Sequence, residues 1–250
     1  MYTLKKSLGQ HFLKDENICR KIVSVIKEGQ PVNLLEVGPG GGAITRFLMD
    51  MEGVDFRAVE LDHEKVLFLE EKFPSIKGKL VEGSILDIDA PFPGAFTLVG
   101  NFPYNISSQI LFRVLDWKDQ VETMVGMFQK EVAVRVTAGP GSKDYGILSV
   151  LIQTYFRVEY LFEVHENCFQ PPPKVKSAVI RLINIGNPWK VDDFHKLLRL
   201  VKAAFGQRRK QLRNPLKPYF SADILQEDIF SKRAEQLSVG DFIGLLNKML

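Results

Sequence analysis

A short apolar run that ends directly in a cluster of glycines constrains the fold of this chain more than any other segment. Residues 33–37 have the composition of a buried strand, the glycines of residues 38–42 follow at once, and residues 43–49 continue with helical periodicity. Further strand and helix patterns follow at 56–60, 64–72, 79–83 and 96–100. Strands that alternate with helices at this spacing predict an α/β domain with a parallel, doubly wound sheet.

The pattern changes after about residue 145. Residues 148–158 and 177–183 are long β-rich or buried segments, and three consecutive prolines lie between them. A linker at 186–188 precedes helical patterns at 192–205, 210–216, 221–224 and 239–249. We therefore expect an α/β domain over residues 1–185 and a small all-helical domain over residues 186–250.

The composition is that of a folded protein without a membrane span or a metal centre. Hydrophobic residues make up 45% and charged residues 25% of the chain, so a core of substantial size can form. No apolar run is long enough to span a bilayer, and the first residues lack the apolar stretch of a signal peptide. The two cysteines form no Cys-x-x-Cys pair and there is no histidine cluster, so we expect no metal and a reduced, cytoplasmic compartment.

Positive charge is concentrated toward the carboxyl end of the chain. Residues 161–250 carry 15 Lys/Arg against nine Asp/Glu, although the net charge of the whole chain is only +3. The densest basic group consists of Arg208, Arg209, Lys210 and Arg213. Arginine suits bidentate contact with phosphate, so we predict that these four residues bind RNA. A solvated basic face is the alternative, and it is reasonable for the more isolated lysines.

The glycine turn and a later acid predict an adenosine ligand. Glycine lets the backbone approach a ligand that a Cβ atom would block, and this applies to Gly38 and Gly40. The Gly-x-Gly-x-Gly spacing matches neither the dinucleotide fingerprint nor a phosphate loop. Glu60 closes the second strand, where an acid can accept both ribose hydroxyls. The alternative is a tight strand-to-helix turn with a surface glutamate.

The segment Asn101-Phe102-Pro103-Tyr104 follows the fourth strand at the same predicted edge. The Asn101 carbonyl and a backbone carbonyl at the Phe102-Pro103 turn could accept the N–H groups of an aromatic amine and favour its in-line attack on a sulfonium methyl. Pro103 fixes φ and removes a competing donor, and Tyr104 offers a ring on which the target base can stack. The alternative is an ordinary turn whose tyrosine covers the core.

Taken together, these segments resemble those of a known family, the ribosomal RNA adenine N6,N6-dimethyltransferases of the small-subunit housekeeping type. The resemblance extends from about Lys6 to Leu216. Besides the glycine turn and the Asn101 segment, it rests on the blocks at 7–13, 129–146, 169–179 and 204–210. It implies a Rossmann-like methyltransferase domain that uses S-adenosyl-L-methionine, followed by a small helical domain that docks RNA.

The resemblance also implies roles for particular residues. His11 and Leu13 would contact S-adenosylmethionine, and Gly38, Glu60 and Asn101 would complete its binding site. Phe169 lies in the segment that closes over the base and is our second candidate, with Tyr104, for stacking. Without the resemblance, we would assign Phe169 to core packing.

One position departs from the family pattern. Ser84 stands where the family usually has an aspartate that accepts a bond from the cofactor's adenine amine. A neutral hydroxyl makes a weaker bond than a carboxylate, so weaker cofactor binding is expected unless the nearby Asp87 compensates.

The function implied by the resemblance is dimethylation of two adjacent adenines in the 3′-terminal hairpin loop of 16S ribosomal RNA. The partner would be 16S ribosomal RNA within the 30S subunit or its precursor, and we expect the protein to act as a monomer. Two alternatives stay open: a 23S ribosomal RNA adenine methylase, and an RNA-binding assembly factor with secondary catalysis. The second is suggested only by Ser84.

Overall fold

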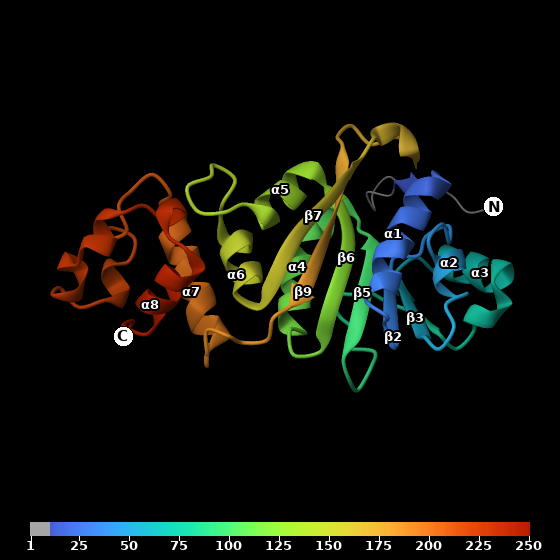
Figure 1. Cartoon of the computed structure of the whole chain (residues 1–250), viewed down its shortest axis with the longest axis horizontal. Helices are drawn as coiled ribbons and strands as arrows, with labels where there is room; N and C mark the ends of the chain where they lie inside the picture. The colour runs from blue at the N-terminus through green and yellow to red at the C-terminus, as the bar shows by residue number, and fades with distance from the viewer. Residues whose placement is uncertain (1–10) are drawn as a thin grey trace. The chain divides into compact units, whose positions relative to one another are not determined.

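A mixed seven-stranded sheet organises the chain in the computed structural model, which describes residues 11–250. Its strands are, in spatial order, β4 (Leu80–Glu82), β3 (Asp55–Glu60), β2 (Asn33–Val37), β5 (Phe96–Asn101), β6 (Val121–Gln129), β9 (Ser177–Asn184) and β7 (Phe156–Val164). The strands from β4 to β6 pair in parallel, whereas β9 is antiparallel to β6. Figure 1 shows β2, β5, β6 and β9 side by side. The predicted α/β class is confirmed, with an antiparallel extension of the parallel sheet.

The order of the strands creates a natural ligand site. β2 pairs with β3 on one side and with β5 on the other, so the chain changes its winding direction between β2 and β5. In open α/β sheets, ligands bind beyond the carboxyl ends of the strands at such a switch point. Here β2 ends at Val37, directly before the glycine turn, and β5 ends at Asn101.

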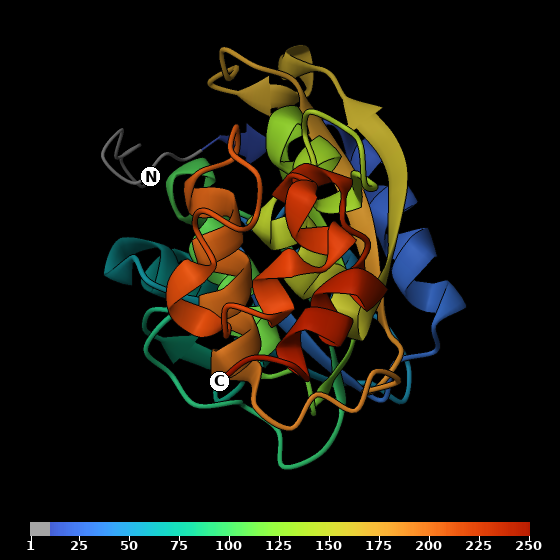
Figure 2. The same ribbon diagram turned by 90° about the vertical axis from the view of Figure 1, so that its left-hand side faces the viewer.

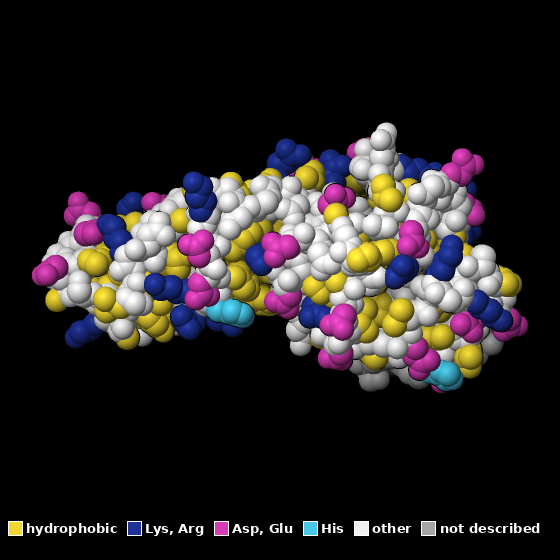
Figure 3. All heavy atoms as spheres, turned by 90° about the horizontal axis from the view of Figure 1, so that it is seen from below, with side chains coloured by type: hydrophobic (Ala, Val, Ile, Leu, Met, Phe, Trp, Pro, Cys, Tyr) yellow, Lys and Arg dark blue, Asp and Glu magenta, His cyan; other side chains and the backbone are white. Residues whose placement is uncertain are grey.

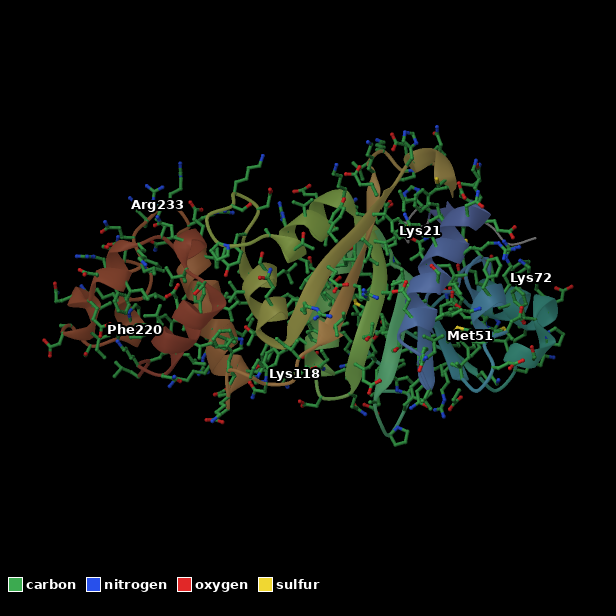
Figure 4. All side chains as sticks on the ribbon, in the orientation of Figure 1. Lys21, Met51, Lys72, Lys118, Phe220 and Arg233 are labelled. Carbon is green, nitrogen blue, oxygen red and sulfur yellow. The ribbon has the colours of Figure 1, made fainter. Side chains whose placement is uncertain are left out.

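The helices of the described chain bury apolar side chains in the cores of the two compact units. They are α1 (Glu16–Glu28), α2 (Thr45–Leu48), α3 (His63–Lys72), α4 (Ser107–Asp116), α5 (Lys130–Thr137), α6 (Ile147–Tyr155), α7 (Phe194–Gly206) and α8 (Val239–Leu246). The Asp15 side chain caps α1 by accepting the backbone N–H groups of residues 17 and 18. On α1, Lys21 (labelled in Figure 4) lies with its ammonium 3.9 Å from the centre of the Phe162 ring, a cation–π contact with β7.

The parallel strands contribute much of the buried core. Leu34, Leu98, Val99 and Val125 are each at most 1% exposed, as expected for strands that are covered on both faces. A separate two-stranded ribbon pairs β1 (Phe12–Leu13) antiparallel with β8 (Phe169–Gln170). This pairing brings the start of the described chain beside a segment more than 150 residues later.

The chain divides into two compact units. The first comprises the described residues up to Ala133 together with Glu159–Asn184, and the second comprises Val134–Val158 together with Ile185–Leu250. The second unit contains α6, α7 and α8, and Figure 2 shows α7 and α8 in orange and red. Its aromatic contacts include half-buried Phe205, which lies 5.9 Å from buried Phe242 and 6.1 Å from buried Tyr145 between ring centroids. The functional division that the sequence predicts at residue 185 stays a prediction.

Three local expectations of secondary structure were wrong: a β-rich segment at 148–158 and helices at 210–216 and 221–224, of which the last has only Ile224 in a short 3-10 turn. Most of the segment 148–158 is helix α6, and only its last residues belong to β7. Residues 210–216 form turns instead of a helix. The reason is that the N–H groups of Leu212 and Arg213 donate to the carbonyls of Lys232 and Phe230, so they make no helical bonds.

No membrane-spanning helix occurs among the described residues, and the face seen in Figure 3 carries both signs of charge. No helix among residues 11–250 is long and apolar enough to cross a membrane. Seen from below, Lys/Arg and Asp/Glu side chains are interspersed, without one large area of a single sign (Figure 3).

Candidate active site

A cavity of about 200 Å³ lies at the switch point, beyond the ends of β2 and β5. The glycine turn forms one wall, and residues 101–104 form another. His11, Leu13 and Glu60 also line it, so a single cavity brings together most of the cofactor residues that the sequence predicts. The rest of the N-terminal block, Ser7 to Gln10, lies outside the described residues.

The glycine turn adopts a conformation that most residues avoid. Gly38 and Gly40 have φ of +67° and +56°, in the left-handed region. A Cβ atom on Gly40 would also lie 2.9 Å from the Phe12 ring. The turn therefore needs glycine for its backbone angles and, at Gly40, for the close approach of Phe12.

Glu60 lines the cavity and is hydrogen-bonded to the glycine turn. It is only 5% exposed. Its Oε2 atom accepts the Gly40 N–H at 3.0 Å, and its Oε1 atom accepts the Asp62 N–H at 3.0 Å. Each carboxylate oxygen can accept more than one bond, so Glu60 can also accept bonds from hydroxyl groups of a ligand in the cavity.

Glu36 is a cavity residue that the sequence analysis missed. It is 2% exposed, and its Oε2 atom has no hydrogen-bond partner among the described residues. Burial raises the pKa of its carboxyl to about 8, with a smaller contribution from the nearby Glu60 and partial opposition from the Thr45 hydroxyl. The available signal was an acid inside the otherwise apolar run 33–37. A buried carboxyl with one unpartnered oxygen, in the wall of a cavity, suits a cationic group of a ligand.

A second cavity of about 110 Å³ shares Gly38, Glu60 and Pro103 with the first. Ser84 lines it, together with apolar side chains such as Leu61 and Ile85. The Ser84 hydroxyl accepts the Leu86 N–H at 3.1 Å. Asp87 is exposed and is not among the lining residues, so the compensation considered for it has no support here. A largely apolar slot with a few polar side chains, here Glu60, Ser84 and Asn105, suits a flat heterocycle.

Asn101 is held by a residue 90 positions earlier. Its side-chain Nδ2 donates to the His11 carbonyl at 2.9 Å. This bond fixes the amide, so the Asn101 carbonyl oxygen is the acceptor that remains for a ligand. The His11 ring lies within hydrogen-bond distance of the Pro171 carbonyl, at 2.9 Å from its Nδ1, and stacks on the Tyr104 ring with centroids 5.4 Å apart. His11 therefore supports both residues of the predicted catalytic edge.

The structure brings three of the four predicted catalytic residues to the cavity. Asn101, Pro103 and Tyr104 line it, and Pro103 has φ of −58° at the entry to a short 3-10 helix, residues 104–106. Phe169 is different: it is 1% exposed in the core, pairs with Leu13 across the β1–β8 ribbon and is not a lining residue. Phe169 therefore has the core position that we would assign to it without the family resemblance.

The four predicted RNA-binding residues lie in the second unit and differ in their surroundings. Arg208 forms an ion pair with Glu235 at 2.7 Å and also donates to the carbonyls of Ser142 and Lys143. The other three, Arg209, Lys210 and Arg213, are exposed. Arg208 thus has a structural role that its neighbours do not share.

Comparison with known proteins agrees with this geometry. The family model described as "Ribosomal RNA adenine dimethylase" matches residues 1–249. The chain is 49% identical to the ribosomal RNA small subunit methyltransferase A of Parabacteroides distasonis over 96% of this chain and 92% of the relative. It is 48% identical to that of Porphyromonas gingivalis, over 96% and 95%.

Solved structures share the fold. A dimethyladenosine transferase from Plasmodium falciparum superposes with a TM-score of 0.82 at 23% identity, covering 96% of this chain and 99% of that one. The 23S rRNA methyltransferase ErmE gives 0.73 at 24% identity, covering 94% and 99%. The match to the family model and the near-full-length relatives together show that this chain belongs to the ribosomal RNA adenine dimethylase family, and it is an S-adenosylmethionine-dependent enzyme.

Proposed function

We propose that the protein dimethylates the N6 amines of two adjacent adenines in the 3′-terminal hairpin loop of 16S ribosomal RNA. The relatives at 48–49% identity are small-subunit methyltransferases, whereas the likeness to the 23S enzyme is one of fold. The observation that carries the proposal is the fixed amide of Asn101 at a cavity that is built for an adenosine ligand. The substrate is then the small subunit or its precursor, in the cytoplasm, and the protein acts as a monomer.

The residues of the two cavities fit S-adenosylmethionine. The unpartnered Oε2 atom of Glu36 suits the ammonium group of its methionine part, and Glu60 suits its ribose hydroxyls. The slot beside Ser84 and Leu61 suits its adenine ring. When bound, the cofactor supplies a methyl group on a sulfonium, which is activated for transfer to a nucleophile.

The chain must make a poor nucleophile attack that methyl group. The lone pair of an adenine amine is delocalised into the ring. Acceptance of an amine N–H by the Asn101 carbonyl localises this lone pair and directs it. The bond from Asn101 to the His11 carbonyl prevents the amide from rotating, so the acceptor is positioned before the base arrives. Pro103, with its fixed φ, holds the adjoining backbone turn.

A base inside a helix cannot reach this cavity, so the target adenine must be presented unstacked. Tyr104 offers the ring on which it stacks, with His11 behind it. We keep Phe169 as a second stacking residue only for a state in which the β1–β8 ribbon has moved, because it is buried in this one.

The second unit supplies the docking surface in this proposal. Exposed Arg209, Lys210 and Arg213 would contact phosphates of the ribosomal RNA. Their separation from the catalytic cavity in the sequence matches the proposed division of labour between residues 1–185 and 186–250. The salt dependence of subunit binding should reflect these contacts.

The test is methyl transfer to purified ribosomal subunits. Small subunits that lack the modification should accept tritiated methyl groups from S-adenosylmethionine, and mapping should place the label on two adjacent adenines. Subunits that already carry the modification serve as the control and should accept none. Label that appears only on naked large-subunit RNA would overturn the proposal in favour of a 23S methylase.

A further inference from the structure

Three charged side chains gather at the edge of the sheet that carries the active site. Lys130 follows β6 directly, and Lys176 directly precedes β9. Because Gln129 and Ser177 are paired across these two strands, the lysines are neighbours, and the Lys130 N–H donates to the Lys176 carbonyl at 2.9 Å. Glu163, near the end of β7, completes the group, which we call the Lys130–Lys176–Glu163 cluster.

This cluster lies next to the catalytic edge. β6 runs parallel to β5, with Met127 opposite Asn101, so Lys130 comes soon after the level at which β5 ends. On the other side, Lys176 adjoins Ser177, whose hydroxyl is hydrogen-bonded to the Tyr104 hydroxyl. Lys176 is therefore the immediate neighbour, along the chain, of the residue that holds Tyr104, the ring on which the target base is proposed to stack.

The two ammonium groups share a single carboxylate. Glu163 forms ion pairs with Lys130 and, at 3.8 Å, with Lys176. The pairing raises the pKa of Lys130 and lowers that of Glu163, so both groups are charged at neutral pH. The cluster keeps a net charge of +1. Its three side chains are 40–50% exposed, and exposed ion pairs of this kind contribute little to stability. Another anion can therefore replace the carboxylate at small cost.

We propose that Lys130 and Lys176 bind a backbone phosphate of the RNA strand that enters the active site, and that Glu163 occupies this phosphate site when RNA is absent. The inference rests on the proposed function, because the strand in question is the one that presents the target adenine. RNA is the occupant that the charge and the position favour: Tyr104 is hydrogen-bonded to Ser177, next to Lys176, so a nucleotide whose base stacks on Tyr104 would bring its phosphates toward this lysine.

The same sheet contains a matched control. On β7, Glu159 forms an ion pair with Arg181 of β9 at 2.7 Å. Arg181 lies opposite Val125, four positions from the Gln129–Ser177 edge. Glu159→Gln thus removes the same charge from the same strand as Glu163→Gln, but away from the active-site edge.

The experiment measures binding to a short unmethylated single-stranded RNA in which uridines flank two adjacent adenines, by fluorescence anisotropy between 50 and 200 mM KCl. The double variant Lys130→Ala/Lys176→Ala should bind about tenfold more weakly at 100 mM KCl, and the slope of log K against log salt should flatten by about 1. Glu163→Gln should bind about fivefold more tightly, because a competing carboxylate is gone. Glu159→Gln should bind like the wild-type protein. Thermal unfolding of each variant checks that the fold is retained.

An unchanged salt slope in the double lysine variant would overturn the proposal. So would equal effects of Glu163→Gln and Glu159→Gln, because the gain would then reflect net charge alone, and so would failure of the wild-type protein to bind the oligomer. The assay needs no methyl transfer and no ribosomal subunit. If the oligomer binds as expected while small subunits accept no methyl, the proposed substrate fails and the phosphate site stands.

Discussion

Replacement of Glu36 by Gln should abolish the release of a proton that accompanies cofactor binding in the wild-type protein. Glu36 is 2% exposed in the cavity wall, and burial raises the pKa of its carboxyl to about 8. At pH 7 about 0.9 of the molecules therefore carry the proton when the cavity contains no cation. An ammonium group beside the carboxyl favours its ionised form, so binding should release close to one proton.

The raised pKa of Glu36 also determines whether the free energy of unfolding rises or falls with pH. Because the pKa is raised on folding, the folded protein keeps a proton that the unfolded chain releases between pH 4.5 and about 8. Stability of the free protein should therefore fall as pH rises through this window, by at most about 1.4 kcal/mol per pH unit from this group. Glu36→Gln has no group to ionise, so this component of the slope should vanish, and the variant should be the more stable protein at pH 8.

Isothermal titration calorimetry measures the released proton directly. Binding of S-adenosylmethionine at pH 7 in phosphate and in Tris gives different apparent enthalpies when protons are exchanged, and the difference yields their number. We expect close to one for the wild-type protein and close to zero for Glu36→Gln, with weaker binding. Urea unfolding from pH 5.5 to 8.5 gives the stability slope. Equal proton release by both proteins would refute the assignment of the buried carboxyl to the cofactor's ammonium.

Three further substitutions test other parts of the site. Asn101→Ala should lower kcat about 100-fold or more while RNA binding is retained, because the acceptor of the amine N–H is lost together with the bond to the His11 carbonyl; near-normal turnover in the tritium assay removes Asn101 from the mechanism. Ser84→Asp should tighten S-adenosylmethionine binding about tenfold in calorimetry, since a carboxylate makes the stronger bond to an adenine amine; unchanged affinity shows that position 84 does not contact it. Arg209→Ala should weaken binding to small subunits and flatten its salt slope by about 1 without lowering Tm. Arg208→Ala should lower Tm because it breaks the pair with Glu235, and equal Tm values for the two arginine variants would contradict their different placement.

Much of the parallel half of the sheet could be predicted because its signals are local. The strand at 33–37, the glycine turn and the strand ending at Glu60 are encoded in consecutive residues, and the structure has them within one residue of the predicted bounds. A short apolar run is ambiguous. The apolar pattern of residues 148–155 is compatible with either a buried helix or a buried strand. In the structure these residues form helix α6 and pack inside the second unit.

Burial is the property that sequence patterns specified least. Glu36 and Phe169 have side chains whose roles depend on what surrounds them, and the structure buries both. Arg208 belongs to a basic run that predicts phosphate contact, yet it is paired with Glu235, 27 residues later. None of these outcomes follows from the neighbouring residues, because each depends on which distant segment supplies the partner.

The sequence by itself determined the chemistry of the site: glycines where the backbone must turn at φ of +67° and +56°, an acid at the end of the next strand, and an asparagine at the end of a third. Parallel strands bring their carboxyl ends to one edge, so local order was enough to predict that these residues meet. Only the tertiary structure decided how they are held. The β1–β8 ribbon places His11 at this edge, where its carbonyl accepts a hydrogen bond from the Asn101 amide, 90 residues later in the chain. Packing around β2 buries Glu36 and excludes water from its carboxyl. Position along the chain fixes residue types and strand ends, but the orientation of a side chain and the pKa of a buried acid are set by neighbours that only folding provides.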